Sequence, residues 1–213
     1  MGLRPHGVSF HVGSQQTDPN QWDAPIATCA AIFRRLQRHG VALKALNVGG
    51  GFPARYSKPI PSIDAYASAI HRSLHTHFGR ALPQLVIEPG RYLVGEAGVI
   101  ETEVLLVARK SRRDEHRWVY IDCGKFGGLA ETMDEAIRYR VVVPDRHGPL
   151  APAVLAGPTC DSADILYERI PVELPDDLRA GDRVQILATG AYTFTYASVG
   201  FNGIPPLRTV FLP

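Results

Sequence analysis

Hydrophobic and polar positions in the first half of the chain alternate between two periodicities. Short apolar runs predict three strands, at 7–11, 43–48 and 84–88. Apolar residues at helical spacing predict a helix in each interval, at 22–39 and 62–78. Ser62 is suited to cap the second helix, and Gly40 and Gly79 are suited to end the two helices. Strands and helices in this order, with strands of a buried type, predict parallel pairing through right-handed crossovers.

The pattern changes after residue 98. Strand-like runs separated by Gly, Pro and Asp follow at 99–107, 118–122, 154–156 and 184–188. The exception is 130–138, where the sequence predicts a short helix. Short strands at this spacing predict a mostly antiparallel β-sandwich or β-barrel. We therefore predict two domains, 1–98 and 99–213.

Composition and charge argue against several classes of protein. The 213 residues are 45% hydrophobic and 21% charged, and the net charge of +2 is interspersed, which argues against nucleic-acid binding. The cysteines Cys29, Cys123 and Cys160 are widely spaced and form no CxxC pair. Neither a disulfide framework nor a metal site is therefore predicted, and a reducing cytoplasm fits best. The apolar runs are too short to span a membrane.

Five short motifs follow predicted strands. They are His-Val-Gly-Ser-Gln at 11–15, Gly-Gly-Gly-Phe-Pro at 49–53, Glu-Pro-Gly-Arg at 88–91, Gly-Pro-Thr-Cys-Asp at 157–161 and Gly-Ala-Tyr-Thr at 190–193. The first three come at the carboxyl ends of consecutive parallel strands. In barrels and open α/β sheets alike, that edge is where ligands bind. We therefore expect one binding site at this edge.

The residue types in these motifs suit an anionic aromatic cofactor. Successive glycines at 49–51 let the backbone approach a ligand and present N–H groups to an anion, although a flexible turn would also account for them. Glu88 could keep a heterocyclic nitrogen protonated, because an opposite charge favours the charged form, or it could pair with Arg91. Arg91 could instead add a cation to the anion site. His11 could stack on a cofactor ring or serve as a hydrogen-bonded structural residue.

In this order, the motifs resemble those of the fold-type III pyridoxal-phosphate decarboxylases, which act on ornithine, arginine, lysine or diaminopimelate. The resemblance runs from about His11 to Pro206. It implies the last strands of a pyridoxal-phosphate-binding TIM barrel of the alanine racemase type, followed by a C-terminal β-sandwich or β-barrel domain. It also implies pyridoxal 5'-phosphate as the cofactor, and a homodimer with composite active sites.

The resemblance also implies roles for single residues. Cys160 and His11 are the implied catalytic residues, with His11 stacked on the pyridine ring and Glu88 paired with the pyridine nitrogen. The residues implied to bind the phosphate are Ser14, Gly49, Gly50, Gly51, Gly90, Arg91 and Tyr192. Cys160 and Asp161 are implied to enter the neighbouring subunit's site. There the cysteine assists protonation of the carbanion, and the aspartate meets the distal ammonium of the amino-acid substrate.

The substrate expected from the resemblance is a basic diamino acid. Cys-Asp at 160–161 is similar to the ornithine type, whereas diaminopimelate enzymes usually carry Cys-Glu. This favours L-ornithine or L-lysine, giving putrescine or cadaverine in polyamine biosynthesis. However, the ornithine enzymes of animals and plants have an aspartate where Cys123 falls. Asp122 is adjacent but faces the opposite side of a strand, so Glu131 or Asp134 could supply that carboxylate.

The Schiff-base lysine of the family has no candidate in this sequence. The lysines are Lys44, Lys58, Lys110 and Lys125. In the family this lysine lies on an early barrel strand, well before the histidine motif. Lys44 begins its predicted strand and so lies at the wrong end of the barrel, and Lys125 follows a β-domain strand. Because a full barrel needs roughly 250 residues, we expect the chain to be the C-terminal portion of a longer enzyme, starting internally and inactive alone.

Three other interpretations stay open. The chain could be a catalytically inactive relative that regulates a full-length partner by binding it. It could belong to a diaminopimelate decarboxylase. A sugar-phosphate barrel enzyme would explain the glycines at 49–51 but not Cys160 and Asp161.

Overall fold

A computed structural model describes residues 2–213, and the chain divides into two compact units between Leu93 and Val94. This division falls a few residues before the predicted boundary between 98 and 99.

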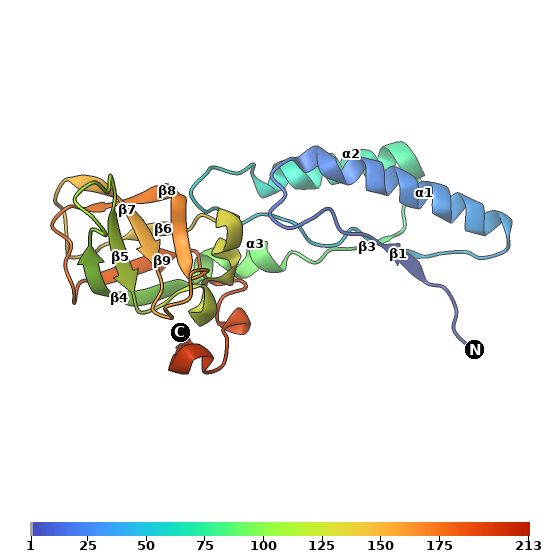
Figure 1. Ribbon diagram of the computed structural model, residues 1–213. Helices are drawn as coiled ribbons and strands as arrows, with labels where there is room; N and C mark the ends of the chain where they lie inside the picture. The colour runs from blue at the N-terminus through green and yellow to red at the C-terminus, as the bar shows by residue number, and fades with distance from the viewer. Residues whose placement is uncertain (1) are drawn as a thin grey trace. The chain divides into compact units, whose positions relative to one another are not determined.

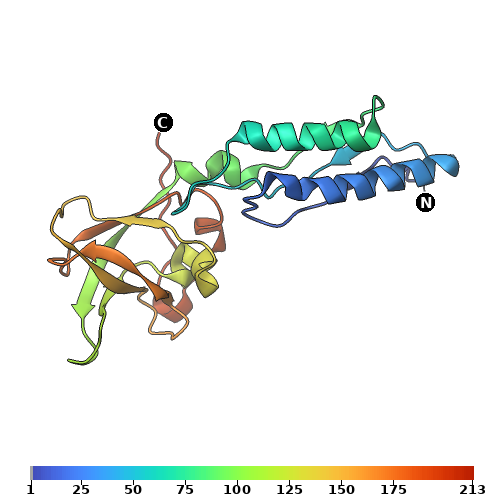
Figure 2. The ribbon, with the colours of Figure 1, turned by 90° about the horizontal axis from the view of Figure 1, so that it is seen from above.

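A small parallel sheet forms the framework of the N-terminal unit. Its strands, in the order β1-β2-β3, are β1 (Gly7–Ser9), β2 (Ala45–Asn47) and β3 (Gln84–Val86). Its helices are η1 (Pro19–Trp22), α1 (Asp23–Arg38), α2 (Ile63–Phe78) and α3 (Gly90–Val94). Both strand pairs are parallel, as predicted. Helices α1 and α2 lie side by side along the sheet (Figures 1 and 2).

The core of this unit fixes the point at which β2 ends. Trp22 and Ile26 are fully buried against Leu46 and Val48. The Trp22 indole N–H donates to the Val48 carbonyl at 3.2 Å. Burial of a large apolar side chain contributes about 1.5–3 kcal/mol. Because Val48 directly precedes Gly49, this core fixes the position of the backbone at the start of the glycine motif.

The ends of α2 agree with the sequence. The Ser62 hydroxyl accepts a hydrogen bond from the Ala65 N–H, which caps the helix start. Gly79 ends the helix with a φ of 64°, a conformation that disfavours residues with a Cβ.

Strand β3 is one of the two edges of the sheet, and all three of its residues are exposed. Leu85, Val86 and the following Ile87 are 44%, 39% and 49% exposed. Parallel strands are normally covered on both faces, because their crossover connections place helices there. An open, apolar edge of this kind is what a part of a larger barrel presents.

The C-terminal unit contains a single six-stranded sheet. Its strands are β4 (Val99–Ala108), β5 (Arg117–Ile121), β6 (Arg140–Val142), β7 (Leu150–Ala156), β8 (Ile165–Pro175) and β9 (Arg183–Leu187). Their order is β6-β9-β4-β5-β7-β8. All neighbours are antiparallel except β5 and β7, so the predicted mostly antiparallel domain is confirmed with one exception.

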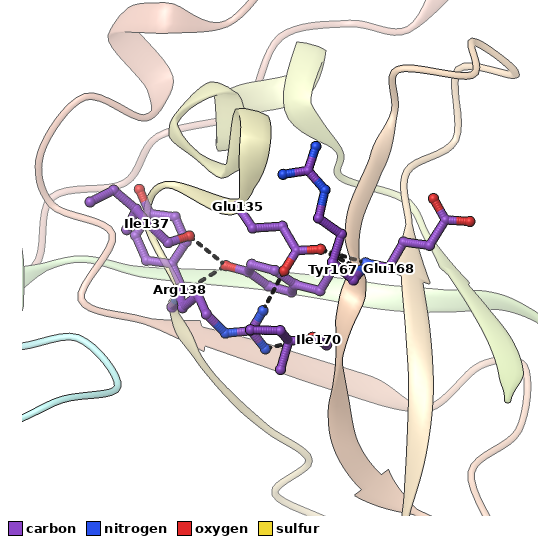
Figure 3. A network of polar contacts seen from close by, with 8 residues as sticks. Glu135, Ile137, Arg138, Tyr167, Glu168 and Ile170 are labelled. Carbon is purple, nitrogen blue, oxygen red and sulfur yellow. Dashed lines mark hydrogen bonds and ion pairs between the residues drawn. The ribbon is translucent and has the colours of Figure 1, made fainter.

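The two edges of this sheet, near β6 and β8, are joined by side chains (Figure 3). The Tyr167 hydroxyl on β8 accepts from the Tyr139 N–H at 2.9 Å and donates to the Ile137 carbonyl at 3.0 Å. The Arg138 guanidinium lies 4.7 Å from the Tyr167 ring centre and donates to the Ile170 carbonyl at 2.7 Å. The sheet is therefore a nearly closed barrel rather than two stacked sheets, so of the two predicted architectures the structure supports the barrel.

Glu135 adds further bonds between the segment before β6 and strand β8. Its carboxylate accepts from the backbone N–H groups of Glu168 at 2.9 Å and Arg169 at 2.6 Å, and from the Arg138 guanidinium at 2.7 Å (Figure 3). One side chain therefore satisfies two edge N–H groups of β8 that no strand pairs.

The predicted helix at 130–138 is corrected by the structure. A π-helical turn, η3 (Lys125–Leu129), is followed by η4 (Ala130–Glu135), which is a 3₁₀ segment. Asp134 and Glu135 adopt left-handed backbone angles, with φ of 53° and 57°. A regular helix cannot continue through such residues. The remaining short turns are η2 (Gly95–Ala97), η5 (Phe194–Tyr196) and η6 (Phe201–Gly203).

Candidate active site

Three predicted site residues of the N-terminal unit occupy equivalent positions after the three strands. Ser9, Asn47 and Val86 are paired across the sheet. His11, Gly49 and Glu88 each come two residues later along the chain. The Glu88 N–H donates to the Gly49 carbonyl at 2.9 Å, which continues the pairing beyond the regular strands. The structure therefore brings these residues together at one edge, as the motif positions predict.

The glycines at 49–51 are required by neighbouring backbone. A Cβ on Gly49 would collide with the Phe10 carbonyl, and one on Gly50 would lie 2.7 Å from the Glu88 carbonyl oxygen. A Cβ on Gly51, whose φ is +96°, would lie 2.5 Å from the Gly13 carbonyl oxygen. These glycines thus let the three loops pack against one another, a requirement that holds whether or not a ligand also approaches the backbone here.

The His11 ring is held by this packing. Its Nδ1 accepts a hydrogen bond from the Gly50 N–H at 3.3 Å, while the residue remains exposed. Because Nδ1 accepts this bond, the single ring proton of the neutral imidazole is on Nε2. An exposed flat ring whose orientation is set by backbone can stack on a planar ligand.

Glu88 is an exposed carboxylate held by an amide. Asn47 Nδ2 donates to Glu88 Oε1 at 2.5 Å, and Asn47 Oδ1 accepts from the Gly49 N–H at 2.9 Å. Asn47 therefore links the carboxylate to the glycine segment. The predicted alternative, a Glu88–Arg91 ion pair, is not among the contacts of Glu88 that the structure shows.

Arg91 is buried, with 6% of its surface exposed. Its guanidinium donates to the Tyr56 hydroxyl at 2.6 Å and lies 5.9 Å from the Tyr56 ring centre. Gly90 begins the short helix α3 beside it. A cation in the segment that follows Glu88 suits an anionic ligand group, and the bond to Tyr56 orients the guanidinium.

Ser14 is exposed in the loop that follows His11, and its neighbour Gln15 fastens that loop. The Gln15 side chain donates to the Ala54 carbonyl at 2.6 Å and accepts from the Ala54 N–H at 3.1 Å. The Gln16 N–H donates to the Gly51 carbonyl at 2.8 Å. These bonds hold the histidine and glycine motifs against each other.

The motif at 157–161 forms a loop of the C-terminal unit that presents Cys160. Cys160 is exposed, and its φ of 61° is rare for a residue with a Cβ. Asp161 is also exposed, and its Oδ1 accepts from the Ala163 N–H at 2.8 Å. Strained, exposed residues of this kind are common at functional sites.

Cys123 differs from Cys160 in its surroundings. It is 3% exposed, and burial, reinforced by the charges of Asp122 and Asp164, raises the pKa of its thiol to about 12. At neutral pH this thiol is uncharged, so it cannot supply the negative charge that a distal ammonium would need. Asp122 hydrogen-bonds the Thr102 hydroxyl and the Glu103 N–H on β4, so its carboxylate already has two partners.

The alternative carboxylates lie on η4. Glu131 is half-buried, whereas the Asp134 side chain is 84% exposed. Asp134 also lines a polar hollow of about 140 Å³. The other lining residues are Lys125, Glu135, Ser162, Ala163, Ile165, Glu168 and Arg169. The substrate contacts predicted for Cys123, Glu131 and Asp161 stay predictions.

Tyr192 lies in a tight turn of the C-terminal unit. Its φ is 55°, the residue is 41% exposed, and its ring centre lies 5.7 Å from that of Tyr196. The preceding Gly190 donates its N–H to the Gly95 carbonyl at 2.9 Å, and a Cβ on it would collide with the Val94 carbonyl. The turn therefore presents Tyr192 from a closely packed base.

Within residues 2–213, no three His, Cys, Asp or Glu side chains gather to hold a metal ion. Over the same residues, no helix has the length and apolar character needed to cross a membrane.

Comparisons with known proteins identify the kind of domain to which these residues belong. Residues 2–95 match the pyridoxal binding domain of pyridoxal-dependent decarboxylases. The chain is 34% identical over 217 residues to diaminopimelate decarboxylase of Staphylococcus aureus, covering 99% of this chain and 49% of that protein. It is 33% identical over 212 residues to antizyme inhibitor 2 of Xenopus laevis, covering 92% and 45%.

The fold agrees as well. The crystal structure of lysine/ornithine decarboxylase from Vibrio vulnificus, complexed with cadaverine, superposes with a TM-score of 0.84 at 35% identity. The match covers 97% of this chain and 54% of that one. The chain spans about half the length of the curated relatives it matches.

Together, the sheet edge and the matches define a pyridoxal-binding α/β unit joined to a β-barrel domain. The chain belongs to the fold-type III family of pyridoxal-dependent amino-acid decarboxylases.

Proposed function

We propose that this chain is the C-terminal portion of a decarboxylase that converts a basic diamino acid, L-ornithine or L-lysine, to its diamine. The observation that carries the proposal is the alignment of His11, Gly49 and Glu88 two residues beyond the paired strand ends. We also propose a homodimer with composite sites, and polyamine biosynthesis as the setting.

The residues present fit pyridoxal 5'-phosphate. The exposed, backbone-held ring of His11 suits the pyridine face, and the exposed carboxylate of Glu88 suits its nitrogen. The predicted phosphate ligands of this unit follow the same three strands, and they are Ser14, Gly49, Gly50, Gly51, Gly90 and Arg91. We assign Tyr192 of the C-terminal unit to the phosphate as well.

When bound, the cofactor supplies a sink for the electron pair of the bond that breaks as CO₂ leaves. Glu88 holds a proton on the ring nitrogen, because its negative charge favours the charged form. His11 orients the ring. Cys160 returns a proton to the α-carbon, and Asp161 binds the distal ammonium of the substrate.

The substrate can be tested in the lysine-complete enzyme, meaning these residues joined to a barrel half that carries the cofactor-binding lysine. We expect CO₂ release from L-ornithine and L-lysine to exceed release from meso-diaminopimelate and L-arginine, because Asp161 matches a bare distal ammonium. Steady-state kcat/KM for the four amino acids decides this. Preference for meso-diaminopimelate, the reaction named for the Staphylococcus aureus relative, would reverse the assignment.

A second candidate function is that of a catalytically inactive regulator. It is supported by the similarity to antizyme inhibitor 2, whose name describes an inhibitor and not a decarboxylase. A folded, cofactor-loaded, lysine-complete protein that releases CO₂ from none of the four amino acids would favour that function.

Composite sites predict complementation. We mix two forms of the full-length enzyme, one in which the cofactor-binding lysine is replaced by alanine and one that keeps this lysine but carries Cys160→Ala. If Cys160 acts in the partner's site, some heterodimers contain one intact site and activity returns. Native mass spectrometry confirms subunit exchange, and exchange without any recovery would place Cys160 in its own chain's site or in none.

A further inference from the structure

A buried carboxylate that the motifs do not include connects two loops of the C-terminal unit. Asp164 directly precedes β8 and is 2% exposed. Its Oδ1 accepts from the Lys125 N–H at 2.7 Å. Its Oδ2 accepts from the Thr159 hydroxyl at 2.7 Å and the Thr159 N–H at 3.2 Å. Both oxygens are therefore used by donors from two separate segments.

Two glycines make this arrangement possible. A Cβ on Gly124 or on Gly157 would collide with the Asp164 carboxylate. Gly124 follows Cys123, and Gly157 opens the loop that carries Cys160. Glycine in the Gly-Pro-Thr-Cys-Asp motif thus has a local physical reason, which is room for this side chain.

The loop that Asp164 holds needs support. Cys160 has a left-handed backbone, which is unfavourable for a residue with a Cβ and persists only when surrounding contacts enforce it. The Asp164 carboxylate binds the residue before Cys160, and the Asp164 N–H donates to the Asp161 carbonyl at 3.0 Å. Asn202 Nδ2 adds a bond to the Thr159 carbonyl at 2.8 Å.

We propose that Asp164 is a positioning residue: its carboxylate fixes the loop that presents Cys160 and Asp161, and ties it to the segment after Cys123. This inference rests on the proposed function for its catalytic consequence. The bonds from Asp164 to Lys125 and Thr159, called the latch below, are a property of the fold. Because Asp164 is buried and already bonded, it acts through Thr159 and not on substrate.

The test replaces Asp164 with asparagine. An asparagine has an amino group in place of one oxygen, so either orientation leaves the Lys125 or the Thr159 N–H without its acceptor. In the lysine-complete enzyme we expect kcat to fall about tenfold, the equivalent of roughly one lost hydrogen bond. Asp176→Asn is the matched control, because this exposed aspartate lies just beyond the other end of β8.

A double-mutant cycle separates positioning from general destabilisation. If Asp164 acts through Cys160, Asp164→Asn should change kcat by less than about twofold in a Cys160→Ala background. An equal loss in both backgrounds would overturn the positioning role. Thr159→Val removes only the hydroxyl donor and should reproduce part of the loss of kcat. Thr159→Ser keeps the hydroxyl and should retain a kcat near that of the wild type. This pair keeps the test valid if Asp164→Asn folds poorly.

Amide hydrogen exchange tests the latch independently of activity. Asp164→Asn should speed exchange at Lys125 and Thr159 by about tenfold or more, with β7 and β8 unchanged. Unchanged exchange at both amides would refute the latch. If exchange changes as expected while the wild-type enzyme decarboxylates no amino acid, the proposed function fails and the latch stands.

Discussion

Glu88→Gln in the lysine-complete enzyme is expected to lower kcat by about 10²-fold or more, the scale seen when one preorganised electrostatic partner is removed. Glutamine keeps the size of the side chain but removes its charge, so the ring nitrogen loses the partner that favours its protonated form. Asn47 can still bond the side-chain oxygen, since only its donor meets Glu88. The change should therefore remove charge with little movement of the loop.

Two measurements distinguish this electrostatic role from loss of cofactor. Bound pyridoxal phosphate, counted by absorbance after dialysis, should stay near the wild-type ratio while saturated turnover falls. Glu101→Gln is a suitable control, because Glu101 is an exposed carboxylate on β4 bonded to Gln185. Turnover near that of the wild type would mean that Glu88 is not the partner of the ring nitrogen.

The sequence predicts the N-terminal unit well because its signals are local. Periodicity located the three strands and two long helices, and Ser62 and Gly79 mark helix ends through capping and positive φ. The regular strands proved shorter than predicted, although single backbone bonds such as that from the Glu88 N–H to the Gly49 carbonyl continue past them. Sequence gives no direct measure of the point where regular pairing ends, which depends on contacts between distant segments.

Strand β8 was not predicted, although it is the longest strand described. It contains Pro171 and Pro175, and prolines are tolerated only where no ladder bond is needed, as at a sheet edge. Its edge N–H groups at Glu168 and Arg169 bond to the Glu135 carboxylate instead of a strand. That arrangement also accounts for the wrong helix prediction, because Glu135 reaches β8 from a left-handed backbone.

The site residues that carry chemistry were predicted from motifs, whereas the residues that hold them were missed. Asn47, Tyr56 and Asp164 are single polar residues with no motif of their own. Their partners Glu88, Arg91 and Lys125 lie 35 to 41 positions away along the chain. One feature of the sequence could have indicated two of them. Asn47 and Asp164 lie within three residues of a glycine-bearing motif, where close packing is expected.

The 213-residue chain by itself is expected to form no stoichiometric, single-site pyridoxyl-lysine adduct when it is mixed with pyridoxal phosphate and borohydride. Lys44 is the clearest case. Its N–H bonds the His6 carbonyl at 2.8 Å just before β2, at the opposite end of the strand from Gly49. Lys110 lies with its Nζ 3.2 Å from the Trp118 ring centre, where cation–π attraction holds it.

The other two lysines are no better placed. Lys58 is exposed in the loop between β2 and α2, and a flexible stem there supplies no preorganised amine. Lys125 lines the polar hollow of the C-terminal unit. Free cofactor can still react with an amino acid directly, so slow background turnover is expected, whereas enzyme-like decarboxylation of L-ornithine is not. Exposed Leu85, Val86 and Ile87 add a tendency to aggregate.

Peptide mass mapping after borohydride reduction measures this prediction, with the lysine-complete enzyme as the positive control. That enzyme should give one adduct per subunit, at a lysine outside these 213 residues. The isolated chain should give scattered, substoichiometric labelling, and light scattering should detect its self-association. A single full-occupancy adduct at any of the four lysines, together with rapid turnover of L-ornithine, would show that the chain completes the active site with its own amine.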